Sequence, residues 1–218
     1  MSKHTKQRWP EPEELAEILA DIKYGTPYLF DIARIIFEDT VDPEAYHRDA
    51  SEAEIVQCNM AFSEWTLFDF DMGNEMTPLK RAARQDPSLT EFSDTQFYSV
   101  FWVISQDRRT NVTRLRDIVT CEDFLVQDPM LARNTRWANG LLGSRIARVD
   151  GVWRLAGQVH LHDNAESHPL PHNEKGGGLG IQNPSAFISH VQSVLGYDGL
   201  YNGTLLESGL VDDTVRSL

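Results

Sequence analysis

The sequence has few cysteines, few positive charges and no long apolar runs, and each shortage excludes a class of protein. Its two cysteines, Cys58 and Cys121, lie far apart in unlike contexts. They offer neither a disulfide framework nor a paired zinc site, so we predict two reduced, buried thiols. No segment approaches the roughly 18 apolar residues of a membrane span, and the N-terminus lacks the apolar core of a signal peptide. We therefore expect a cytoplasmic protein without a membrane partner.

Positive charge is scarce and unevenly distributed. The chain carries 33 acidic residues against 20 lysines and arginines, a formal net charge of −13. Residues 1–75 hold 17 acids and 6 bases, whereas residues 76–165 hold 10 acids and 12 bases. An acidic chain repels phosphate backbones, so nucleic acid is an unexpected partner unless the arginines of the middle region converge on one face. These arginines alternate with apolar residues, which is typical of the wet face of a sheet: Arg108, Arg109, Arg114, Arg116, Arg145, Arg148 and Arg154.

Apolar residues at helical spacing dominate the first part of the chain. Residues 11–23 place four aliphatic side chains on one helix face, and Gly25 follows as a stop signal. Thr26-Pro27 then predicts a second helix start, with Thr26 as the N-cap and Pro27 at the first helical position. The second helix has a broad apolar stripe made of Leu29, Phe30, Ile32, Ala33, Ile36 and Phe37.

Two further helix starts follow. Ser51 and Glu54 form a capping box for a helix that continues to about Phe70. Thr77-Pro78 repeats the start signal of the second helix and predicts a short helix that ends before Pro87. The first part of the chain is therefore a small helical unit.

From Phe97 onward the apolar pattern changes to that of strands. The run YSVFWVIS is rich in β-branched and aromatic residues, and QDRRTN supplies a turn before the next strand. Asp150-Gly151 separates the strands Leu141–Val149 and Trp153–His162 and favours a tight hairpin. Counting the strand that includes Phe124–Gln127, five short antiparallel strands indicate a small barrel or a curled sheet.

These patterns together predict an α+β protein. We expect a helical unit over residues 1–90 and a five-stranded, antiparallel, barrel-like unit over residues 91–163. Residues 164–218 are expected to hold a glycine-rich loop, a C-terminal helix from Ala186 to Leu195, and an irregular tail. The loop contains GGGLG, but it lacks both nucleotide-binding fingerprints, so it is interpreted as a flexible connector.

Several short motifs occur in an order that resembles a family of uncharacterised bacterial proteins. The motifs are Glu64-Trp65-x-Leu67-Phe68-Asp69, Thr77-Pro78-Leu79, Leu115-Arg116-Asp117-Ile118, Val126-x-Asp128, Arg145-Ile146-Ala147-Arg148 and Trp153-Arg154-Leu155-x-Gly157. The similarity spans roughly residues 55–160. It implies helices followed by a small β-barrel and implies no activity. Some members of that family carry a SEC-C-type zinc motif, whose cysteine cluster is missing from this chain.

The segment Ala61–Leu79 combines large aromatic rings with carboxylates. Its Trp65 and Phe68, three residues apart, share a helix face, and we expect both to be buried between the helices and the strands. Carboxylates beside apolar rings can have raised pKa values, which is one mark of a functional site. A possible acidic site therefore consists of Glu64, Asp69 and Asp71. An acidic edge around an aromatic core explains the same residues.

The only cluster with ligand chemistry is a group of histidines. Its imidazoles are His160, His162, His168 and His172, with Asp163, Glu166 and Glu174 among them. On a strand His160 and His162 point to the same face, and imidazole with carboxylate suits zinc or another transition metal. The simpler interpretation is the exposed polar end of a hairpin.

The function that these patterns favour is that of a non-enzymatic protein-binding or adaptor module without a cofactor. It would present its acidic helical surface or the mouth of the barrel to a protein partner. The alternative is a metal-dependent hydrolase that uses the histidines of residues 160–172. The sequence leaves the oligomeric state open.

Overall fold

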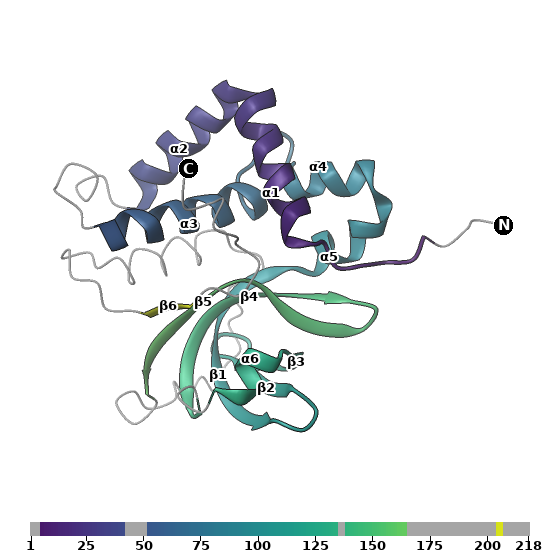
Figure 1. Cartoon of the computed structure of the whole chain (residues 1–218), viewed down its shortest axis with the longest axis vertical. Coiled ribbons are helices and arrows are strands. Elements are labelled where there is room, and N and C mark those ends of the chain that lie inside the picture. The colour runs from purple at the N-terminus through teal and green to yellow at the C-terminus, as the bar shows by residue number, and fades with distance from the viewer. Residues whose placement is uncertain (1–4, 42–51, 135–137, 165–203, 207–218) are drawn as a thin grey trace. The chain divides into compact units, whose positions relative to one another are not determined.

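Helices precede strands along the chain, as the sequence predicts (Figure 1). The computed structural model describes residues 5–41, 52–134, 138–164 and 204–206. Two compact units meet in sequence at Thr95 and Gln96, a helical unit before this point and a barrel unit after it. The predicted α+β class is confirmed. The predicted C-terminal helix and the glycine-rich loop lie outside the described residues.

Four of the five helices described in the first unit begin where the sequence signals place them, whereas the short helix over residues 90–95 was not predicted. They are α1 (Pro12–Ala20), α2 (Pro27–Val41), α3 (Glu52–Phe68), α4 (Pro78–Gln85) and α5 (Thr90–Thr95), with a π-helical turn η1 (Asp21–Gly25) and a 3₁₀ turn η3 (Pro87–Leu89). The Thr77 hydroxyl accepts a hydrogen bond from the Lys80 amide at 3.2 Å, which confirms the predicted N-cap. Ser51 lies outside the described residues. Among the described residues, no helix combines the length and the apolar character needed to cross a membrane.

The core of the helical unit is aromatic. Trp65 and Phe68 are buried, which confirms that part of the prediction, whereas their position between the helices and the strands stays a prediction. The Trp65 ring lies 5.6 Å from the ring of Phe37 on α2, and the Phe68 ring lies 6.2 Å from the ring of Phe92 on α5. Such aromatic pairs add to the free energy gained by removing large rings from water. These ring contacts lie within the helical unit.

Arg8 ties the start of the chain to the helical unit. Its guanidinium donates to both carboxylate oxygens of Glu14, at 2.5 and 2.6 Å, and to Asp86 at 2.7 Å. The bonds from Arg8 hold the pKa of Glu14 below its usual range. The pKa of Asp86 is lowered mainly by the hydrogen bonds from Ser88, with a further contribution from Arg8. The cluster joins the first turn of α1 to the turn that follows α4.

The second unit is a five-stranded barrel with one additional short strand. Its elements are β1 (Phe97–Asp107), β2 (Val112–Asp117), β3 (Asp123–Gln127), α6 (Pro129–Arg133), β4 (Gly140–Val149), β5 (Val152–Asn164) and β6 (Thr204–Leu206). The strand order is β3-β2-β1-β4-β5-β6, and a further pairing between β3 and β5 closes the barrel. The five predicted strands are present.

Two details differ from the sequence-based prediction. The β3–β5 pairing is parallel, with Val126 opposite Trp153, so the sheet is mixed rather than wholly antiparallel. Within the region predicted to be an irregular tail, Thr204–Leu206 forms β6 and pairs with β5. Both pairings join residues that are far apart in the sequence, so local turn and strand signals do not reveal them.

The predicted hairpin at Asp150-Gly151 is confirmed. Asp150 has φ +51° and Gly151 has φ +77°, and they connect the antiparallel strands β4 and β5. Positive φ at both central residues is the geometry of a type I′ turn. This turn fixes the register of β4 against β5, with Val149 opposite Val152.

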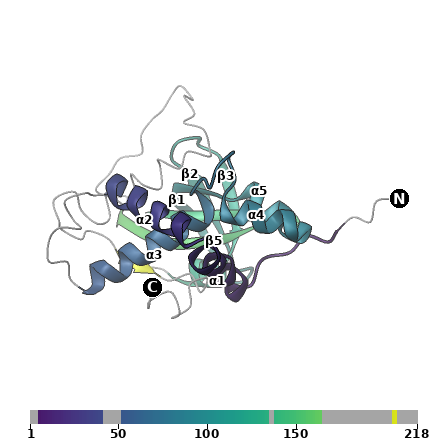
Figure 2. The same ribbon diagram turned by 90° about the horizontal axis from the view of Figure 1, so that it is seen from above.

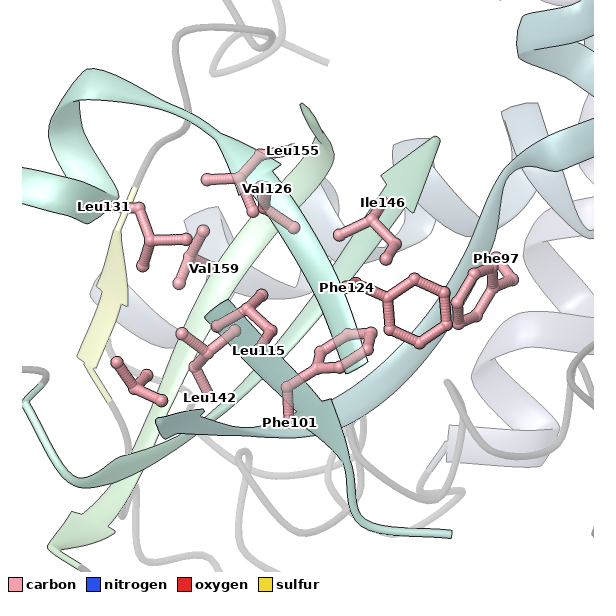
Figure 3. Close-up of a cluster of buried hydrophobic side chains, with 11 residues drawn as sticks. Phe97, Phe101, Leu115, Phe124, Val126, Leu131, Leu142, Ile146, Leu155 and Val159 are labelled. Atoms are coloured by element: carbon pink, nitrogen blue, oxygen red, sulfur yellow. The ribbon is translucent and has the colours of Figure 1, made fainter. Parts of the chain in front are cut away.

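Apolar side chains fill the interior of the barrel (Figure 3). They come from all five barrel strands and from α6: Phe97, Phe101, Val103, Leu115, Phe124, Val126, Leu131, Leu142, Ile146, Leu155 and Val159. The Phe97 and Phe124 rings are 5.4 Å apart, and the Phe101 and Phe124 rings are 6.0 Å apart. A small barrel filled in this way is a packed core, so binding by this unit would use its outer surface.

Candidate binding surface

Helix α2 has two apolar faces, and the inner one forms part of the aromatic core. Phe30, Ala33 and Phe37 are buried on this face. The rings of Phe30 and Phe37 lie 5.3 and 5.5 Å from the ring of Phe62 on α3. The two helices lie side by side in both views of the molecule (Figures 1 and 2). This face therefore positions α2 firmly on α3.

The outer face of α2 is also apolar, and it is exposed. Tyr28, Ile32 and Ile35 are 63%, 44% and 58% exposed. Their spacing of i, i+4 and i+7 places them in one row along the helix. Ile36 flanks the row at 43% exposure, so the row from Tyr28 to Ile36 extends for about 12 Å at 1.5 Å per residue. We call these four residues the α2 row.

The α2 row corrects part of the sequence-based interpretation of this helix. Ile32 and Ile36 were assigned to one stripe with Phe30 and Phe37, but the structure separates them onto an exposed and a buried face. Sequence reasoning did not single out Tyr28 and Ile35. The sequence signal that could have revealed them is their helical spacing with Ile32, at i, i+4 and i+7. This spacing forms a second apolar row beside the buried row of Phe30, Ala33 and Phe37.

Another exposed ring lies just before the α2 row in sequence. Tyr24, in the π-helical turn η1, is 74% exposed, and the Lys23 ammonium lies 5.3 Å from the centre of its ring. Short π-helical segments are frequent at functional sites. The turn ends at Gly25. The hydroxyl of the next residue, Thr26, donates to the Ile22 carbonyl at 3.2 Å. The transition from η1 to α2 thus has a defined local geometry.

Charged residues beside the α2 row are mainly acidic. Asp31 and Asp39 are exposed, and Glu38 is half-buried. Asp31 and Glu38 lie on one flank, whereas Asp39 continues the row four residues after Ile35. The basic residue Arg34 turns toward the core, because its guanidinium lies 4.2 Å from the centre of the Phe62 ring. The exposed row is therefore apolar with an acidic flank and an acidic C-terminal end.

The three residues of the possible acidic site have different surroundings. Glu64 is buried on α3, Asp69 is half-buried, and Asp71 is exposed. Helix α3 ends at Phe68, so Glu64 lies on the helix whereas Asp71 lies beyond its end. The Asp71 carboxylate accepts hydrogen bonds from the amides of Gly73 and Met76, at 2.8 and 3.0 Å. Asp71 thus stabilises the turn after α3.

The structure describes the backbone of two of the four candidate metal ligands. His160 and His162 lie on β5, opposite Gly143 and Leu141 of β4. Alternation along a strand directs side chains two residues apart to the same face. His168 and His172 lie outside the described residues. Within the described part of the chain, no three His, Cys, Asp or Glu side chains are grouped so that they could hold a metal ion. The metal site remains a prediction.

The arginines of the barrel do not all lie on a wet face. On β2, Arg114 is exposed and Arg116 is half-buried, and both bind Asp123 on β3. Arg116 Nε donates to Asp123 at 2.8 Å. These bonds, with Arg116 contributing most, hold the pKa of Asp123 well below its usual range. Arg145 is instead 1% exposed and donates to the side-chain oxygen of Gln96 at 2.5 Å. The prediction of a wet position was wrong for Arg145.

The prediction of buried thiols was wrong for Cys121. This residue is exposed in the turn between β2 and β3, where its φ is +60°. Its amide donates to the Asp117 carbonyl at 3.0 Å, so local turn geometry determines its position. Cys58 lies on α3, but its side chain is outside the described part of the structure.

Comparison with protein-family models, with curated proteins and with solved structures finds no match to this chain. The resemblance to a bacterial family therefore stays a prediction, and the geometry of the site carries the functional argument.

Proposed function

We propose that this chain is a non-enzymatic protein-binding module that docks an apolar segment of a partner protein on the α2 row. The observation that supports this proposal is the exposure of Tyr28, Ile32 and Ile35 in one continuous row. Single apolar residues on a surface are ordinary, whereas contiguous apolar rows bordered by polar residues mark interaction sites.

The geometry of α2 suits such a role. Its inner face is held by the rings of Phe30, Phe37 and Phe62, so the outer face is presented by a firmly positioned helix. A preorganised surface loses little conformational entropy when a partner docks. Burying the exposed part of each isoleucine would contribute about 1 kcal/mol, taking about 25 cal/mol per Å² of apolar surface.

The proposal is tested by affinity capture with the full chain from cells that naturally make it. Three baits are compared: the natural chain, the double variant Ile32→Asn/Ile35→Asn, and Leu125→Asn. Leu125 is 62% exposed on β3, so its variant is a matched change of an exposed aliphatic residue in the barrel. We expect a partner that the natural chain and Leu125→Asn retain and that the double variant loses.

Circular dichroism should show that all three baits are folded, because both changed surfaces are exposed in the natural protein. Capture of the same set of proteins by all three baits would contradict docking on the α2 row.

A further inference from the structure

We infer that the partner segment is a basic amphipathic helix that lies antiparallel along the α2 row. This inference rests on the proposed function and specifies the chemistry of the partner. It is carried by the distribution of charge around the row rather than by the row alone. An apolar row accepts any apolar segment, whereas charge at its border selects among them.

The border of the α2 row favours positive charge. Asp31 is three residues after Tyr28 and four before Ile35, and Glu38 is three residues after Ile35, so both flank the row. Arg34 is drawn toward the Phe62 ring and pairs with Glu38 at 3.6 Å. Because Arg34 already offsets the charge of Glu38, lysines or arginines along one edge of a partner helix would face mainly Asp31 on this flank.

The two ends of α2 differ in charge, and this difference sets the direction of the partner. The C-terminal end of a helix carries partial negative charge, and the last turn of α2 contains no basic residue to offset it. Asp39 adds a full negative charge there, whereas Lys23 lies before the N-terminal end of α2. The positive N-terminal end of a partner helix is therefore stabilised beside Asp39, which makes the arrangement antiparallel.

The same charges disfavour two other occupants of the row. A symmetric pair of chains uses the same patch twice, so an antiparallel pair would place Asp31 of one copy on the same side as Asp31 of the other, while Glu38 is offset by Arg34 of its own helix. Like charges that face each other across such a pair repel each other and disfavour the dimer. Membrane-surface helices carry lysine and arginine beside their apolar face, whereas this flank is acidic.

The test uses the full chain and three fluorescent synthetic peptides of 18 residues. The first carries leucines three and four residues apart with lysines along both edges. The second replaces each lysine by glutamate, and the third shuffles the first so that its leucines no longer share a face. Binding is measured by fluorescence anisotropy at low and at physiological salt. We expect the first peptide to bind at least about tenfold more tightly than either of the others.

Two double variants and a charge-matched control locate the binding. Ile32→Asn/Ile35→Asn should weaken binding of the basic peptide by about tenfold or more. Asp31→Asn/Asp39→Asn should weaken it by about threefold, and by less at high salt because salt screens exposed charges. Glu13→Gln/Glu17→Gln removes the same number of charges from exposed positions of α1 and should leave binding unchanged.

The outcomes separate this inference from the proposed function. Equal binding of the basic and acidic peptides, lost in the isoleucine variant, would overturn the basic partner and leave docking on the α2 row intact. Binding of neither amphipathic peptide, or binding that the isoleucine variant retains, would overturn the basic helix at this surface.

Self-association in sedimentation that the isoleucine variant abolishes would identify a second copy as the occupant and overturn the inference. Preference for anionic vesicles over the peptides, lost in that variant, would also overturn it.

Discussion

The two units of this protein treat their apolar side chains differently. In the barrel, Phe101, Leu115 and Val126 point into a closed interior and are fully buried. In the helical unit, α2 buries Phe30 and Phe37 on one face and exposes Ile32 and Ile35 on the other. Closing a sheet into a barrel gives every inward side chain a neighbour, whereas a helix packed on one side leaves its opposite face exposed.

This difference indicates a division of roles. The apolar side chains that fill the barrel stabilise it and are inaccessible to partners. The α2 row adds less to folding than the core does because its side chains keep about half of their surface in water, so its apolar character is better explained by binding. Changes that separate stability from binding can therefore test the comparison.

The largest effect is expected from a change in the core of the helical unit. Trp65 is buried against Phe37 and Phe70, with ring centres 5.6 and 5.5 Å away. Trp65→Ala should lower the free energy of unfolding by about 3–5 kcal/mol, because a large cavity replaces the ring. Denaturant titration monitored by circular dichroism measures this change. Ile35→Ala is the comparison and should change stability by less than about 1 kcal/mol. Similar losses in both variants would erase the distinction between the two faces.

A smaller effect is expected from the hairpin of the barrel. Gly151→Val places a β-branched residue at φ +77° and should cost about 1–3 kcal/mol of stability. Gly25→Ala is the matched control, because nothing lies within 4 Å of an added Cβ there and the position has no positive φ. Thermal unfolding compares the two variants. Equal stability of the Gly151 variant and the natural chain, or helical backbone chemical shifts across residues 145–157, would contradict this account of the hairpin.

Acid should weaken both units to a modest extent. The pKa values of Glu14 and Asp86 in the helical unit and of Asp123 in the barrel are lowered in the folded protein. A carboxylate whose pKa is lower in the folded protein raises the free energy of unfolding at pH values above its unfolded pKa of about 4. This contribution is lost progressively as the pH falls from that value toward the lower pKa of the folded protein. Solvent screening keeps the effect small because these groups are partly exposed.

Thermal unfolding between pH 7 and pH 2.5 measures this acid effect. Asp123→Asn should lose less stability than the natural chain over the acidic part of this range. Identical pH dependence of the two proteins would show that the cluster of Arg114, Arg116 and Asp123 does not stabilise the folded barrel.

No measurable effect is expected from added transition metal. On the simpler interpretation of His160 and His162, zinc or nickel leaves the melting temperature of untagged protein unchanged. Metal analysis of the purified chain provides a direct measurement. A stoichiometric metal, lost in the variant His160→Ala/His162→Ala and released near pH 6 as imidazoles protonate, would instead favour the metal-dependent hydrolase.

Local signals predicted most of the fold. Thr77-Pro78 marks a helix start by its hydroxyl acceptor and its fixed φ, and Asp150-Gly151 marks a hairpin by its tolerance of positive φ. These signals act over a few residues and hardly depend on the rest of the chain. Four helix starts and the positions of five strands along the chain could therefore be predicted from the sequence, whereas the short helices α5 and α6 were not.

Features that depend on distant neighbours could not be predicted in this way. The parallel pairing of Val126 with Trp153 has no local signature. Arg145 occupies a position that alternation assigns to water, yet it is buried and bound to Gln96. On α2, both faces carry apolar residues, so periodicity alone cannot tell which face is covered. The candidate binding surface became apparent only when the structure separated the two faces.

Hydrogen–deuterium exchange of the full chain, with and without the basic amphipathic peptide, tests the central claim most directly. Docking on the α2 row predicts slower amide exchange within Pro27–Val41 when the peptide is added, and no change in the barrel strands. The Ile32→Asn/Ile35→Asn variant should show no such protection. Protection confined to the barrel, or equal protection of α2 in the natural chain and the variant, would contradict the claim that the α2 row is the binding surface.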